Sequence, residues 1–177
     1  MNQIERPRSG RSASLEERVR NGIRMWQTEL PQLDSSGKEV CGRVVALAGV
    51  LNQMFNDALA AFDLKYHEYG VLATLRASGA PHSLTQKQLL ETILFSSGGM
   101  SNLLTRLEKK GLITRESDTE DRRVMHVRLS ETGLAVASDA MAIQSGTETA
   151  FCAVLSEAER EALISGLGKL LDAAREF

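Results

Sequence analysis

The stretch of residues 84–129 constrains the fold of this chain more than any other part of its sequence. Thr85 is a predicted N-cap for a short helix. Ser96 and Ser97 predict the start of a second helix, and Gly111 predicts its end. The apolar residues of this second helix recur at i, i+3, i+4 and i+7: they are Met100, Leu103, Leu104 and Leu107. The pattern predicts two short helices joined by a turn.

Two predicted β-strands, residues 112–116 and 123–129, follow the second helix, with the polar turn 117–122 between them. A helix that fits a major groove, beside a ribbon that reaches phosphates or a minor groove, is a DNA-reading unit. We therefore predict a mainly α fold, a winged helix-turn-helix with a two-stranded β-wing. N- and C-terminal helices for dimerisation are expected to flank it.

The face of the second helix opposite its apolar stripe is rich in hydrogen-bonding side chains. At about 100° per residue, donors, acceptors and small residues gather on that side. Arg106 and Lys109 are the predicted base or phosphate contacts. The full predicted DNA-binding set is Ser97, Ser101, Asn102, Thr105, Arg106, Lys109, Arg122 and Arg123.

The phrases SSGGMSNLLTRLEKKGLI, DTEDRR and VRLSETG resemble signatures of the MarR family of bacterial transcriptional regulators. In the family's wing motif, D-x-R-D-x-R, Asp118, Asp121 and Arg123 match, and Glu120 stands where an arginine is common. The resemblance implies a salt bridge in which Asp121 orients Arg123 toward the minor groove. It also implies a homodimeric repressor on a palindromic DNA operator, released by a small-molecule effector.

The remainder of the chain is predicted to be helical around this unit. We expect a mobile arm over residues 1–13, N-terminal helices for dimerisation and lobe packing over 14–65, the DNA-binding domain over 66–129 and C-terminal dimerisation helices over 130–177. The long helix predicted from Ser36 to Phe62 carries two apolar stripes, which implies burial on two sides. One side is expected to need a partner chain.

Trp26, the only tryptophan, lies on a helix that the minimal fold does not need. This added helix resembles the urate-responsive branch of the family, which places a tryptophan over a ligand pocket. The branch's other ligand-contacting positions fall here on Gly70, Ser78 and Leu103, so we expect the architecture without urate as its ligand. Trp26 and Tyr66 are the candidate effector-binding residues, and the alternative for Trp26 is a plain packing role.

Two cysteines, Cys41 and Cys152, are candidate redox residues. The spacing from Cys41 to Tyr66 and Tyr69 is similar to the organic-peroxide-sensing branch of the family. That similarity implies a thiol switch at Cys41, with Cys152 of a second subunit as a resolving partner. The alternative is that Cys41 is a small buried hydrophobic residue.

Composition excludes several other classes of protein. No two of the three histidines lie a helical turn apart and the cysteines are distant, so no metal site or cofactor is expected. The sequence contains no recognisable nucleophile–base motif and no glycine-rich phosphate-binding loop, so we do not expect an enzyme. Without 18 consecutive apolar residues or a signal peptide, we expect no membrane span and a cytoplasmic location. A winged helix that serves only as a protein-interaction module remains the alternative function.

Overall fold

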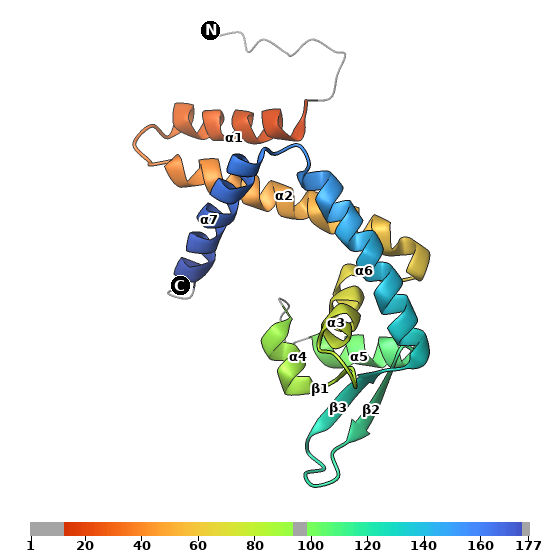
Figure 1. Cartoon of the computed structure of the whole chain (residues 1–177). Helices are drawn as coiled ribbons and strands as arrows, with labels where there is room; N and C mark the ends of the chain where they lie inside the picture. Colours follow the sequence, from red (N-terminus) through yellow and green to blue (C-terminus); the bar gives the residue numbers. More distant parts are fainter. Residues whose placement is uncertain (1–12, 94–98, 175–177) are drawn as a thin grey trace. The chain divides into compact units, whose positions relative to one another are not determined.

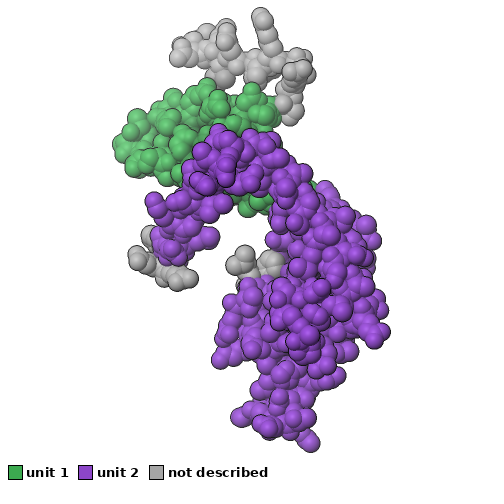
Figure 2. Space-filling model, in the orientation of Figure 1, with its two compact units in different colours: residues 1–54 green, residues 55–177 purple. Residues whose placement is uncertain are grey.

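The computed structural model describes residues 13–93 and 99–174. It divides into two compact units, residues 1–54 and residues 55–177, which Figure 2 colours separately. The helices and the strands are labelled in Figure 1. The helices are α1 (Leu15–Glu29), α2 (Ser36–Leu59), the 3-10 helix η1 (Ala60–Phe62), α3 (Tyr66–Ala77), α4 (Gln86–Thr92), α5 (Met100–Lys109), α6 (Glu131–Cys152) and α7 (Glu157–Ala173). The strands are β1 (Ser83–Thr85), β2 (Ile113–Ser117) and β3 (Met125–Leu129).

Helices α1, α4, α6 and α7 each begin after a serine or threonine whose side chain caps the first turn. Ser14 and Ser156 each form a capping box with the glutamate three residues later, as their sequences predict. The side chains of Thr85 and Ser130 accept from backbone N–H groups of α4 and α6. Each bond satisfies an N–H group that the first turn of a helix leaves without a partner.

The first unit packs α1 against the start of α2. Ile23 is its buried apolar residue, and Gly42 lies beside Val19, with the position of a Cβ 3.6 Å from Val19 Cγ1. Arg43 donates to Glu16 at 2.7 Å and to Glu39 at 2.6 Å. Both ion pairs are exposed, so they contribute little to stability.

The second unit has its hydrophobic core beneath α5. The apolar face of α5 is buried as predicted, and α3 contributes the next largest group of buried side chains. The centre of this core contains Leu59, Val71, Leu72, Leu75, Leu89, Leu104, Leu107, Ile113 and Val127. This packing fixes which face of α5 remains in solvent.

The sheet has three antiparallel strands in the order β1-β3-β2, where the sequence predicts a two-stranded ribbon. The additional strand β1 pairs with β3, with Leu84 opposite Val127. On the other side of β3, Arg115 of β2 also lies opposite Val127. The predicted mainly α winged helix-turn-helix is confirmed, and the wing (β2, β3 and the turn between them) extends from this small sheet (Figure 1).

Many large apolar side chains are exposed on the single chain. Most of them lie on α1, α2, α6 and α7, and these include Met25, Val40, Val44, Val45, Leu47, Ile143, Leu163, Ile164, Leu167, Leu170 and Leu171. The stretch Ser36–Phe62, with mean hydropathy 1.3, is long and apolar enough to cross a membrane by length and composition alone. These two properties do not distinguish a membrane helix from a helix whose apolar stripes pack on protein.

Candidate DNA-binding interface

Helix α5 presents a polar face to solvent. Ser101, Asn102, Arg106 and Lys109 are exposed and Thr105 is half-buried. The Thr105 hydroxyl donates to the Ser101 carbonyl at 2.9 Å, which leaves its oxygen lone pairs as acceptors. Ser97, also predicted in this set, lies outside the described residues.

Arg106 is exposed over 59% of its side chain, yet one of its nitrogens is held by a buried group. Its Nε donates to Glu68 Oε1 at 3.2 Å. Glu68 belongs to the buried stripe of α3 with Val71, Leu72 and Leu75. Glu68 was not among the residues predicted from the sequence, although a carboxylate on a core-facing stripe indicates that a partner is required.

The wing brings Asp121 and Arg123 together. Asp121 accepts from Arg123 Nε and Nη2, each at 3.0 Å, which is a bidentate pair. The same carboxylate also accepts from the Arg123 backbone N–H at 3.0 Å. Arg123 was expected to begin a strand, but β3 begins only at Met125, so both residues lie in the turn, which brings them together. Hydrogen bonding to Arg123 lowers the pKa of Asp121 and raises the pKa of Arg123.

Asp118 organises the turn of the wing. Its carboxylate accepts from the backbone N–H groups of Glu120 at 2.8 Å and Asp121 at 3.1 Å. His126 Nε2 lies 2.9 Å from the other carboxylate oxygen. The backbone bonds from Asp121 and Glu120, followed by His126, lower the pKa of Asp118 to about 2. Asp118 therefore stays ionised near neutral pH and holds the turn that presents Arg122 and Arg123, both exposed.

A groove of about 420 Å³ in the first unit contains Trp26, which is 44% exposed. Lys38 Nζ lies 3.7 Å from the centroid of the Trp26 ring, a cation–π contact, and Arg18 also lines the groove. Cys41 lines it as well and is exposed. In the single chain Cys41 is thus exposed, on the side of α2 that faces the groove, and a packing role against a second chain stays the alternative.

Tyr66, the other effector candidate, belongs to the second unit. Its ring lies 4.9 Å from the Phe55 ring and 6.0 Å from the Tyr69 ring, centroid to centroid. Burial, and then the charge of Glu148, raise the pKa of Tyr66. Cys152, at the end of α6, is half-buried. No group of three or more metal-ligating side chains occurs among residues 13–93 and 99–174.

The comparisons with known proteins agree with this geometry. The MarR family model matches residues 62–124, which include α3, α4, α5 and most of the wing. An uncharacterised HTH-type transcriptional regulator of Bacillus cereus is 33% identical over 129 residues, which are 72% of this chain and 84% of the relative. The chain belongs to the MarR family.

Two further proteins are similar to this chain over most of its length. The HTH-type transcriptional regulator PecS of Dickeya dadantii is 25% identical over 148 residues, which are 84% of this chain and 89% of PecS. The S. aureus MepR–DNA complex has a TM-score of 0.70 and 26% identity, and the match covers 76% of this chain and 97% of MepR. As a MarR-family protein, the chain is a transcriptional regulator that binds DNA.

Proposed function

We propose that this MarR-family protein is a dimeric repressor that binds a palindromic operator and is released by a small-molecule effector. The observation that carries the proposal is the exposed polar face of α5 beside an arginine-tipped wing. The proposed contacts are Ser97, Ser101, Asn102, Thr105, Arg106 and Lys109 from the helix region, with Arg122 and Arg123 from the wing. Helix donors suit base edges in a major groove, and the exposed wing arginines suit phosphates or a minor groove.

A second copy of the chain is the proposed occupant of the exposed apolar surface. In this proposal residues 14–65 and 130–177 form the dimer and residues 66–129 read DNA. A two-fold dimer places two recognition helices about 34–36 Å apart, one helical turn of DNA. An effector changes DNA affinity only if it binds one dimer geometry more tightly than another. The groove that contains Trp26 is the proposed effector site.

The test is binding of the full chain to the duplex upstream of its own gene, with a scrambled duplex for comparison. Arg106→Ala is expected to weaken operator binding and relax base preference by about 1–3 kcal/mol, the contribution of one bidentate base contact. Arg123→Ala is expected to weaken all duplexes and to flatten the salt dependence by about one unit of slope. Lys169→Ala removes an equal charge from the polar side of α7, where Lys169 is exposed, and should change neither property.

The proposal fails if wild-type protein shows no preference for its upstream duplex. In that case the winged helix acts as a protein-interaction module. If wild type binds selectively and both Arg106→Ala and Arg123→Ala bind like wild type, the assignment of contacts to α5 and the wing is wrong.

A further inference from the structure

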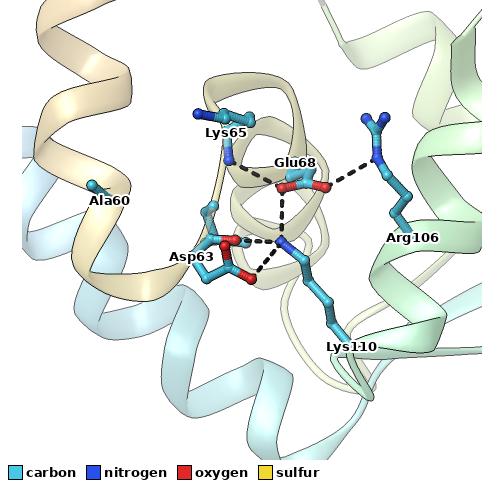
Figure 3. Close-up of a pocket in the computed structure, with 7 residues that line it drawn as sticks. Ala60, Asp63, Lys65, Glu68, Arg106 and Lys110 are labelled. Atoms are coloured by element: carbon cyan, nitrogen blue, oxygen red, sulfur yellow. Dashed lines mark hydrogen bonds and ion pairs between the residues drawn. The ribbon is translucent and has the colours of Figure 1, made fainter.

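Glu68 is the most deeply buried charged side chain beside the proposed DNA-binding surface, with 4% of its side chain exposed. Its Oε2 accepts from the Lys65 backbone N–H at 3.0 Å and from Lys110 Nζ at 3.2 Å. Its Oε1 accepts from Arg106 Nε at 3.2 Å. Figure 3 shows the carboxylate between Arg106 of α5 and Lys110, the residue that follows α5. These donors offset the cost of burying a carboxylate.

The two cations that pair with Glu68 differ in how much of each remains available. Lys110 is 28% exposed, and its ammonium group also contacts the carbonyl and the carboxylate of Asp63. It ties the end of α5 to the turn before α3. Arg106 is 59% exposed and gives Glu68 only its Nε, while its two terminal nitrogens point away from the carboxylate (Figure 3).

An arginine offers two pairs of parallel N–H donors, one formed by Nε with one terminal nitrogen and the other by the two terminal nitrogens. Because Glu68 occupies Nε, only the terminal pair of Arg106 is free for a bidentate contact. A guanine edge in the major groove presents two acceptors that match such a pair. An arginine already held at Nε also loses less side-chain freedom on binding.

We infer that Glu68 is a positioning residue that restricts Arg106 to reading one guanine per half-site through its terminal nitrogens. The inference rests on the proposed function, since it requires a DNA operator. Glu68 itself touches no base. It acts through the orientation of Arg106.

A role of Glu68 through its charge and a role through positioning Arg106 predict opposite changes in DNA binding when Glu68 is replaced. If only its charge mattered, removing a carboxylate near DNA would strengthen binding to every sequence. If its oxygen holds Arg106, removing the acceptor weakens recognition of the operator in particular. Glu68→Gln removes the charge and keeps an acceptor oxygen, whereas Glu68→Met removes both at similar length. The pair of variants separates the two effects.

The experiment measures binding of the full-length protein to the operator and to operators substituted at each base pair. Glu68→Met is expected to lose about tenfold of its preference for guanine at one position per half-site, within the range for one bidentate contact. Glu68→Gln is expected to keep that preference within about twofold while binding all duplexes more tightly. In an Arg106→Ala background, Glu68→Met should cause no further loss of preference.

Lys110→Met is the matched control, because it removes the other cation of the same carboxylate. It should lower the melting temperature and weaken all duplexes equally, with base preference unchanged. The inference is overturned if Glu68→Met retains full preference, if the loss is uniform across sequences, or if the loss persists without Arg106. A wild-type protein without any operator preference rejects the proposed function and the inference together.

If Glu68→Met does not fold, the wild-type protein supplies the second measurement. Nitrogen-15 NMR of the Arg106 side chain should show an Nε–H protected from solvent exchange both in the free protein and in the operator complex. The terminal N–H signals should shift on binding. An unprotected Nε–H in the complex would overturn the inference.

Discussion

Asp118 shows how one side chain orders the turn of the wing. Its folded pKa of about 2 lies below its usual 3.8, because the N–H groups of Asp121 and Glu120 and the ring of His126 bind the ionised form. A lowered carboxyl pKa stabilises the turn above pH 3.8, and the contribution disappears as the pH falls through about 2.

We therefore expect the amide signals of Glu120 and Asp121 to titrate with a midpoint near pH 2, followed by NMR. Asp118→Asn should abolish this titration. A midpoint near 3.8 in wild type would mean that these hydrogen bonds do not form in solution.

Cys41 is exposed beside Trp26, so an oxidant can reach its sulfur. If Cys41 is a redox switch, mild organic hydroperoxide should release operator DNA from wild type and not from Cys41→Ser. Cys152→Ser separates the two oxidised forms, since it blocks a disulfide and permits a sulfenic acid. Equal binding of oxidised and reduced wild type would leave Cys41 without a sensing role.

At the scale of elements, the start of α6 is locked against the turn that follows α5. The Ser130 hydroxyl donates to the Gly111 carbonyl at 2.7 Å, and the Ser130 N–H donates to the Leu112 carbonyl at 3.1 Å. A Cβ on Gly133 would lie 1.9 Å from the Leu112 carbonyl oxygen. Only glycine allows this approach between α6 and Leu112, the residue before β2.

Gly133→Ala should therefore destabilise the protein by about 1–3 kcal/mol, the usual cost of overpacking, measured by urea unfolding. Gly146→Ala is the matched control on the same helix, where a Cβ meets nothing within 4 Å. That substitution should stabilise by about 0.5–1 kcal/mol through helix propensity. Equal effects of the two substitutions would contradict the close approach.

The groove between α1 and α2 combines an aromatic ring with the cations Lys38 and Arg18. An anionic aromatic molecule can replace the contact between Lys38 and Trp26 with one stacking and one charged contact. Titration with aromatic carboxylates should quench the single tryptophan and release operator DNA over the same concentrations.

Lys38→Met should weaken both responses to these carboxylates, and urate should act poorly in wild type. Quenching without release of DNA would show that the ligand binds in the groove but does not regulate DNA binding.

At the scale of the whole molecule, the exposed apolar side chains of α7 predict association. Ile164 is 64% exposed, so Ile164→Glu costs little in an isolated chain and places a charge in the proposed interface. Sedimentation should show a dimer for wild type and a monomer for Ile164→Glu, with loss of operator binding. Ser165→Glu adds the same charge on the polar side of α7 and should remain dimeric. A dimeric Ile164→Glu protein would exclude Ile164 from the interface.

The sequence by itself determined the features that depend on near neighbours. The helix starts at Ser14, Thr85 and Ser156 were predictable, because a cap needs a donor only three residues away. The buried face of α5 followed from spacing along one helix in the same way.

Only the tertiary structure decided the features that depend on distant neighbours. Strand β1 is only three residues long, and it forms by antiparallel pairing with β3, in which Leu84 lies opposite Val127. The sequence showed Arg106 as a polar residue on a helix face. Its orientation comes from Glu68, 38 residues earlier, which the folding of α3 against α5 brings within 3.2 Å. Local patterns carry no information about such a pairing, because chain folding alone brings the two groups together.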